Sequence, residues 1–159
     1  MQERALHYPL QTPVNTQPAG DNGQHDDVRE IAKDGLVLAR HIRPGGFKKG
    51  LAFYSGNEEF LQVGTWHYDK GQQLRAHVHN RVQREINRTH EVVIVIKGSM
   101  AARIFDEELT LVETITVCEG ELLVVMNGGH DYTILEDDTR ILEIKNGPFL
   151  GRDIDKTLF

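Results

Sequence analysis

The sequence contains a single cysteine, Cys118, and no long run of apolar residues. One cysteine cannot build an intramolecular disulfide framework or a cysteine-rich zinc site, and it suits the reducing cytoplasm, where we expect this chain. The longest apolar run, residues 92–96, has the length of a strand and falls far short of the ~18 residues that span a bilayer. The first twenty residues also lack the basic start and apolar stretch of a secretory signal. We therefore expect no membrane partner.

Basic residues are scarce, since 18 lysines and arginines stand against 24 aspartates and glutamates, which gives a formal net charge of -6. Non-specific binding to nucleic acid needs a basic surface that releases counterions from phosphates, so this composition argues against a nucleic-acid partner. A chain of 159 residues has room for one ordinary hydrophobic core. We expect a small molecule as the ligand.

The N-terminal residues differ in composition from the rest of the chain. Residues 1–27 are largely polar and contain three of the five prolines, Pro9, Pro13 and Pro18. Their apolar residues are too sparse to define a buried face, so we predict a flexible arm over residues 1–27. The alternative is an arm that folds over a neighbouring subunit. Residues 28–159 are predicted to form one domain.

Short alternating segments separated by turns run from residue 28 towards the C-terminus. Strands are expected at residues 28–31, 35–42, 51–54, 60–68, 74–79, 91–96, 100–105, 110–118, 121–126, 132–135 and 140–144. Short strands at intervals of ~8–12 residues, without a long amphipathic helix, indicate an antiparallel sandwich or barrel. A short helix over residues 82–89 is the one helical alternative.

Three histidines and a glutamate form the strongest candidate for a chemical site. His77 and His79 lie two apart in an expected strand, so both imidazoles project from the same face. Glu91 begins the most apolar strand, where an inward carboxylate without a partner would be costly to bury. His130 follows a glycine turn that lets the backbone fold back closely. Imidazole and carboxylate groups are the ligands that first-row divalent metals prefer.

The order of these residues resembles the two motifs of the cupin superfamily. The first motif is matched by Gly71, His77, His79, Glu91 and Gly98, and the second by Gly120, Met126, Asn127, Gly128 and His130. The resemblance implies an all-β fold, a single cupin-type antiparallel β-barrel also described as a double-stranded β-helix or jelly roll. It also implies one divalent metal ion, Fe, Mn, Ni, Co or Zn, bound by His77, His79, Glu91 and His130.

The chain departs from the cupin pattern in both motifs. The family spacer between the second histidine and the glutamate is short, whereas eleven residues lie between His79 and Glu91. Met126 stands in place of the usual proline, and the histidine of the second motif comes one residue early. Glu85 is the alternative carboxylate ligand, because it lies within the inserted segment.

The inserted segment and its flanks supply further candidate site residues. Four arginines are candidates for binding a carboxylate or phosphate of the substrate: Arg75, Arg81, Arg84 and Arg88. The alternative is a solvated loop whose charges bind nothing.

Two side chains are expected to share the inward face of the metal ligands, Tyr132 and His67. Either could act as a general acid or base, although Tyr132 suits a core position equally well. Glu143 and Lys145 are expected to lie on one face, as an interior or a surface ion pair.

Fold alone does not fix function in the cupin superfamily, so the resemblance leaves several functions open. The first is a metal-dependent isomerase or epimerase of carbohydrate metabolism, acting on a small polar, anionic or sugar-derived substrate. The second is an Fe(II) dioxygenase, and the third is a barrel that binds a small ligand without turnover. A homodimer formed through sheet edges is expected in each case.

Overall fold

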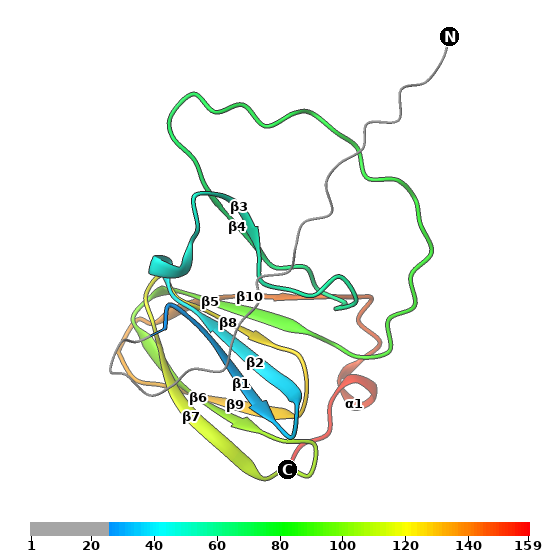
Figure 1. Cartoon of the computed structure of the whole chain (residues 1–159). Helices are drawn as coiled ribbons and strands as arrows, with labels where there is room; N and C mark the ends of the chain where they lie inside the picture. The colour runs from blue at the N-terminus through cyan, green and yellow to red at the C-terminus, as the bar shows by residue number, and fades with distance from the viewer. Residues whose placement is uncertain (1–25) are drawn as a thin grey trace.

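The structure is a computed structural model and describes residues 26–159, in which the chain folds into ten strands and two short helices (Figure 1). The strands are β1 (Val28–Lys33), β2 (Leu36–Ile42), β3 (Gly50–Phe53), β4 (Gly64–His67), β5 (Glu91–Lys97), β6 (Ser99–Phe105), β7 (Leu111–Cys118), β8 (Leu122–Val125), β9 (Gly129–Ile134) and β10 (Arg140–Lys145). The helices are η1 (Pro44–Gly46) and α1 (Arg152–Asp155). Residues 1–25 of the expected arm lie outside the described residues.

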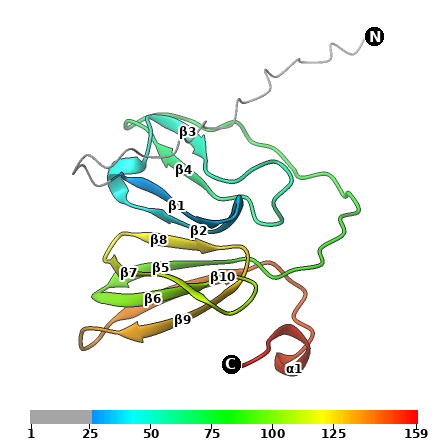
Figure 2. The same ribbon diagram turned by 60° about the horizontal axis from the view of Figure 1, so that its bottom comes forward.

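The strands pair antiparallel in three sheets. The largest has the order β1-β2-β8-β5-β10, a second has the order β7-β6-β9, and β3 and β4 form a hairpin. In Figure 2 the β3–β4 hairpin and the three-stranded sheet β7-β6-β9 lie on opposite sides of the five-stranded sheet. The five-stranded sheet is therefore the middle layer of the fold.

The first core fills the space between the five-stranded and three-stranded sheets. It includes Val93 and Val95 from β5 and Met100, Ala102 and Ile104 from β6, of which all but Val93 are fully buried. Each strand contributes alternate residues to this space, as a half-buried strand should.

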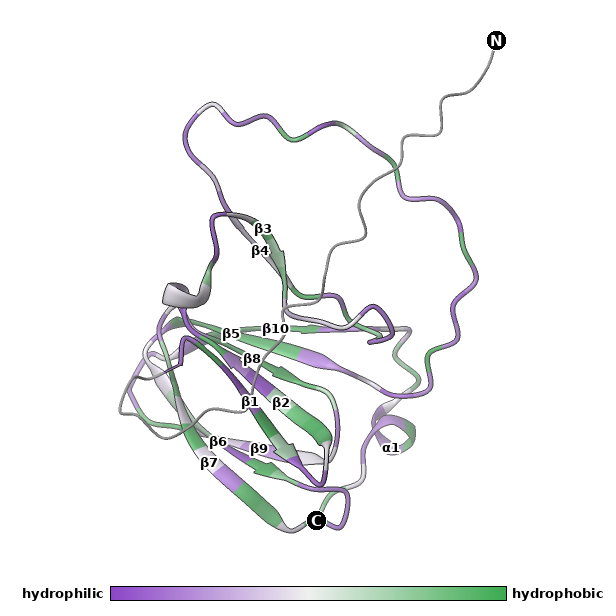
Figure 3. Cartoon of the chain, in the orientation of Figure 1, coloured by the Kyte–Doolittle hydropathy of each residue, from purple (hydrophilic) through white to green (hydrophobic). Residues whose placement is uncertain are grey.

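The second core lies on the other face of the five-stranded sheet. There Val92 of β5 and Val124 of β8 pack with Ala52 of β3 and with Tyr54 and Val63 from the loop between β3 and β4. β5 is thus covered on both faces, and this explains why its sequence is continuously apolar instead of alternating. Figure 3 shows the apolar stretches concentrated in these strands.

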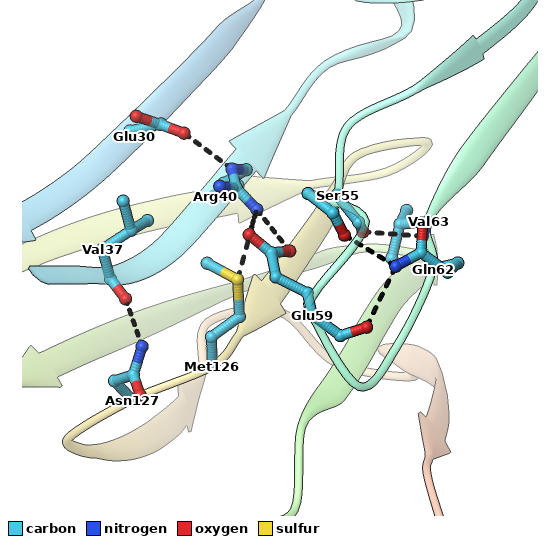
Figure 4. A network of polar contacts seen from close by, with 10 residues as sticks. Glu30, Val37, Arg40, Ser55, Glu59, Gln62, Val63, Met126 and Asn127 are labelled. Carbon is cyan, nitrogen blue, oxygen red and sulfur yellow. Dashed lines mark hydrogen bonds and ion pairs between the residues drawn. The ribbon is translucent and has the colours of Figure 1, made fainter. Parts of the chain in front are cut away.

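A polar network closes one end of the second core (Figure 4). The Arg40 guanidinium of β2 donates to Glu30 of β1 at 2.7 Å and to both carboxylate oxygens of Glu59, at 2.8 and 2.7 Å. Its Nη1 atom also lies 3.2 Å from the Met126 sulfur. Arg40 thereby ties the loop between β3 and β4 to the five-stranded sheet.

The prediction of an all-β antiparallel fold is confirmed, and the cupin-type barrel or jelly roll stays a prediction. In the described part of the chain, β1 and β10 end one sheet, and β7 and β9 end another, without hydrogen bonds that join the two sheets into a barrel. The architecture is a layered sandwich with open edges. No helix in residues 26–159 has the length and apolar character needed to cross a membrane.

The expected strand at residues 74–79 is wrong as a description of this structure. Residues 72–87 have no regular secondary structure, and every residue from 66 to 89 is exposed. The segment forms a long loop that leaves the sheets (Figure 1). The helix expected as an alternative at residues 82–89 is also absent, because these residues belong to the same loop. Of the expected strand at residues 60–68, only Gly64–His67 pairs with another strand. Alternation marks an amphipathic strand, but a strand also needs a neighbour for its backbone hydrogen bonds.

Candidate functional site

Glu91 is the first residue of β5 and lies on the face that meets the first core. Its side chain is 6% exposed, and it shares this face with Val93 and Val95. The strand register places it directly opposite Lys145 of β10. A carboxylate so deeply buried requires hydrogen bonds or a counter-charge, because desolvation of an ionised group is costly.

β9 supplies two side chains to the same space. His130 pairs with Ile104 of β6, and Tyr132 pairs with Ala102, and both partners are fully buried in the first core. Paired residues project from the same face of a sheet, so His130 and Tyr132 point towards the five-stranded sheet. Gly128 lies in the turn before His130 and has a φ of 68°. A Cβ at this position would collide with the carbonyl oxygen of Phe105. The expected close glycine turn before His130 is therefore present.

These residues form what we call the Glu91 cluster, which consists of Glu91, His130, Tyr132, Glu143 and Lys145. The Tyr132 hydroxyl donates to Glu91 Oε1 at 2.7 Å, and His130 Nε2 lies 2.9 Å from the same oxygen. Lys145 Nζ lies 3.2 Å from Glu91 Oε2 and 2.9 Å from Glu143 Oε1. The expected ion pair between Glu143 and Lys145 is confirmed, and it continues into the buried carboxylate.

The cluster holds Glu91 in its charged form. Burial alone would raise the pKa of Glu91, but the His130 hydrogen bond and charge, together with Tyr132 and Lys145, lower it to about 2. Burial and the adjacent Glu91 charge raise the pKa of Tyr132 well above its usual value, so the phenol keeps its proton. Burial opposes the charge of Lys145, but hydrogen bonds to Glu143 and Glu91 and the charge of Glu91 raise its pKa. At neutral pH the cluster is a carboxylate surrounded by donors.

The structure brings together two of the four expected metal ligands, Glu91 and His130. His77 and His79 lie in the exposed loop, where their ring centroids are 5.1 Å apart and His77 Nδ1 is 3.1 Å from the carbonyl oxygen of Arg75. Within residues 26–159, no group of three or more ligand-type side chains is arranged to hold a metal ion. The alternative ligand Glu85 is exposed in the same loop.

The four candidate arginines differ in their surroundings. Arg75, Arg81 and Arg84 are exposed in the loop. Arg88 bonds within the protein, since its guanidinium lies 2.9 Å from Glu107 Oε1 and donates to Asn127 Oδ1. Arg88 is thus partly committed to holding the end of the loop, and a role of all four in binding an anion stays a prediction.

The two candidate acid–base residues, Tyr132 and His67, lie in different parts of the structure. Tyr132 shares the inward face with His130, as expected, and it both contacts the first core and donates to Glu91. His67 lies on β4, where its Nδ1 atom is 3.2 Å from the carbonyl oxygen of Phe47 and its side chain is exposed. Its described hydrogen bond therefore connects it to the hairpin region and not to the Glu91 cluster.

The sequence analysis did not predict the contact of Lys145 with Glu91 or the burial of two histidines, His41 and His90. The contact of Lys145 with Glu91 depends on the register of β10 against β5, for which the sequence carries no local signal. His41 is fully buried with its Nε2 atom 2.7 Å from Glu121 Oε2. His90 is 5% exposed and packs against Phe60, with ring centroids 5.1 Å apart. His41 shares its strand parity with Val37 and Ala39, and His90 with Val92 and Ile94, and this is the sequence signal that could have indicated their burial.

The resemblance to the cupin superfamily depends on the sequence motifs. Protein-family models, curated proteins and solved structures were each compared with this chain, and none of the three comparisons finds a match. The sandwich and its Glu91 cluster are therefore the basis on which a function can be proposed.

Proposed function

We propose that this chain is a metal-dependent enzyme of cupin type, an isomerase or epimerase that acts on a small polar, sugar-derived substrate. The observation that carries the proposal is the buried Glu91 carboxylate with the imidazole of His130 beside it, in the space between two sheets. Both residues were expected as ligands from the sequence motifs.

Glu91 and His130 fit the chemistry of one divalent ion. Two donors that each lie about 2.1 Å from one ion are about 3.0 Å apart at an octahedral angle and about 3.4 Å apart at a tetrahedral angle. His130 Nε2 and Glu91 Oε1 are 2.9 Å apart. A carboxylate and an imidazole form a donor set used by Zn, Mn, Fe, Co and Ni, so the metal identity stays open.

We propose that His77 and His79 complete the site when their loop pairs along the open edge of β9. Every odd-numbered residue from 73 to 89 is polar, whereas Leu74, Ala76 and Val78 between them are apolar. This alternation would place the polar residues on one face of a strand and the apolar residues on the other, although the loop has no partner strand in the described residues. Figure 3 shows short apolar stretches among the polar ones along this loop. The unpaired backbone of β9 offers the missing hydrogen bonds.

The chain's own residues have distinct roles in this proposal. A divalent ion in the site would polarise a carbonyl or hydroxyl oxygen of the substrate. Tyr132 keeps its proton and would donate a hydrogen bond to a substrate oxygen, provided that its hydroxyl turns from Glu91 to the substrate. Arg75 and Arg81 share odd-numbered positions with His77 and His79, so they would face the same space when the loop pairs.

We also propose that the protein forms a homodimer. β10 ends the five-stranded sheet in the described residues, and exposed strand edges favour association. Leu142 and Ile144 of β10 are 49% and 43% exposed, and they lie on the same face of that edge strand because they are two residues apart. A second copy of the chain would cover both the edge and these apolar side chains.

Exchange of substrate protons with solvent tests the proposed reaction class. The protein, loaded in turn with Mn²⁺, Zn²⁺, Ni²⁺, Co²⁺ or Fe²⁺, is incubated in D₂O with a panel of aldoses, ketoses and their phosphate esters. Isomerisation or epimerisation by proton transfer would place deuterium on a carbon of at least one sugar, which NMR detects. Glu91→Gln provides the control and is expected to abolish the exchange. Oxygen uptake with iron, in place of deuterium incorporation, would favour a dioxygenase and contradict this proposal.

A further inference from the structure

The residues after β10 connect the two larger sheets across one open side of the sandwich. β10 ends the five-stranded sheet, and β9 ends the three-stranded sheet. Residues 149–159, which we call the strap, run from the end of β10 through α1 to a point beside β6 and β9, as Figure 1 and Figure 2 both show. The strap therefore joins the two edge strands that supply all of the Glu91 cluster except Glu91 itself.

Phe159 fastens the strap to the three-stranded sheet. Its ring packs edge-on against the ring of Phe105, with the ring centroids 5.1 Å apart and the ring planes at 87°. The ring also lies over Gly129, where a Cβ would come within 2.8 Å of it. An aromatic pair in this geometry is favourable beyond the burial of its area. Since Gly129 directly precedes His130, Phe159 is seated beside the start of the strand that presents His130.

Lys156 places the middle of the strap beside the Glu91 cluster. Its side chain contacts that of Lys145. Lys145 in turn lies 3.2 Å from Glu91 Oε2 and 2.9 Å from Glu143 Oε1. Two ammonium groups at short range repel each other, so this contact depends on the two carboxylates around Lys145. The strap thus touches the cluster through Lys156 and the neighbouring sheet through Phe159.

The strap is held by few contacts. None of residues 149–159 is buried, and Leu150 and Leu158 are 61% and 72% exposed. The Leu150 amide donates to Asp155 Oδ2 at 3.3 Å, so this hydrogen bond lies within the strap. Gly151, with a φ of 111°, provides a backbone position at which the strap can turn. A segment with so little buried surface opens at a lower cost in free energy than the strands beside it.

We propose that the strap is a gate to the Glu91 cluster, closed while Phe159 is seated on Gly129 and open to a ligand when Phe159 leaves this seat. With the strap seated, the side chains of Glu91 and His130 are 6% and 28% exposed. Closure over a bound ligand would exclude water from it. The inference goes beyond the proposed function and does not depend on a metal ion, because it concerns access to side chains that the structure itself brings together.

Modification of histidines by diethyl pyrocarbonate at constant pH tests the gate, because this small reagent must reach the imidazole of His130. The measurement is made in EDTA, so that its outcome is independent of metal binding, and mass spectrometry of peptides gives a rate for each histidine. Phe159→Ala should raise the rate at His130 about fivefold, the factor that corresponds to the loss of one aromatic pair. Ile154→Ala is the matched control and should leave this rate unchanged, since Ile154 is 73% exposed in the strap.

Two other histidines separate opening of the strap from unfolding of the protein. His41 is fully buried, so its rate reports unfolding, and His67 is exposed on β4, so its rate reports the activity of the reagent. Both should keep their wild-type rates in Phe159→Ala. An unchanged rate at His130 would overturn the proposal, and so would a rise at His130 that is matched by an equal rise at His41.

Gly129→Ala disturbs the same seat from the opposite side, because its Cβ would lie 2.8 Å from the Phe159 ring. It should also raise the rate at His130 about fivefold. In the Phe159→Ala background Gly129→Ala should have no further effect, because no ring is left to displace. Independent effects of the two substitutions would overturn the assignment of Gly129 as the seat of Phe159. A protein that binds no metal would contradict the proposed function and leave these results unchanged.

Discussion

Glu91 and Lys145 stand opposite each other on the neighbouring strands β5 and β10, and the Lys145 ammonium lies 3.2 Å from the Glu91 carboxylate. The pair explains how a strand that is otherwise apolar can begin with a buried charge. It also connects the edge strand of the larger sheet to the two β9 side chains, His130 and Tyr132, which bond to the other oxygen of Glu91.

Tyr132→Phe should destabilise the metal-free protein by about 2 kcal/mol, the usual contribution of a hydrogen bond to a charged group. The substitution removes the hydroxyl that donates to Glu91 at 2.7 Å and leaves the ring in the first core. Urea unfolding measures the change, with Tyr68→Phe as the control because Tyr68 is exposed. Equal stability of the two variants would show that the hydrogen bond to Glu91 contributes little.

Arg40→Met should destabilise the fold by about 3 kcal/mol, because it leaves Glu30 and Glu59 near each other without a counter-charge. Urea unfolding is again the measurement. Arg140→Met provides the matched control, since Arg140 pairs with Asp138 at the exposed surface and should change the free energy of unfolding by less than about 0.5 kcal/mol. A loss below about 1 kcal/mol for Arg40→Met would contradict the view that this network fastens the β3–β4 loop to the sheet.

His41 should make stability depend on pH in the mildly acidic range. Burial lowers the pKa of His41 despite the hydrogen bond and charge of Glu121, and Arg43 and Arg29 lower it further. The unfolded chain therefore takes up a proton near pH ~6.5, before the folded protein does. The free energy of unfolding should fall as the pH is lowered through ~6.5 and should level off once the folded pKa is passed.

Urea unfolding between pH 5 and 8, chosen to cover that range about the ordinary histidine pKa of ~6.5, compares wild type with His41→Gln. The glutamine variant should lose part of the pH dependence, although it starts from a lower stability. His67→Gln is the control, because His67 is exposed on β4. Parallel pH profiles of wild type and His41→Gln would refute this assignment.

The sequence predicted the strands and the inward side chains much better than it predicted their neighbours. Alternation and turns identify β6, β7 and β10, and apolar residues on both faces identify β5, because these patterns report burial within one segment. The same alternation in residues 74–79 predicted a strand that does not form in this structure. A local pattern shows which face a segment would bury, but it does not show whether a partner strand is available.

The residues of the site show the same difference between what a segment reveals about itself and what it reveals about its neighbours. Glu91 and His130 could be predicted as neighbours from the order of the motifs, and Tyr132 from its spacing of two residues from His130. The contact of Lys145 with Glu91 could not, because it depends on how β10 aligns with β5. The cupin type of the fold stays a prediction, since closure of a barrel is set by hydrogen bonds between sheet edges and not by residues within a strand.

Leu142→Lys should weaken the proposed homodimer. A charge at this half-exposed position of the edge strand β10 would lie in the expected contact and would have to lose water on association. Sedimentation of wild type at micromolar concentration should show a dimer of the 18.0 kDa chain, and the variant should shift towards the monomer. Leu109→Lys is the control, since Leu109 is similarly exposed, at 47%, in the turn between β6 and β7. A monomeric wild type would contradict the dimer.

The metal content of the purified protein tests the central claim most directly. Elemental analysis should find one equivalent of a divalent transition metal in the wild type, and background levels in a variant with His77→Ala and His79→Ala together, because two of four ligands are lost. His67→Ala should retain the full equivalent, as His67 lies outside the proposed ligand set. An unchanged metal content in the double variant, or a wild type that remains free of metal after incubation with Fe²⁺, Mn²⁺, Ni²⁺, Co²⁺ and Zn²⁺, would contradict the account.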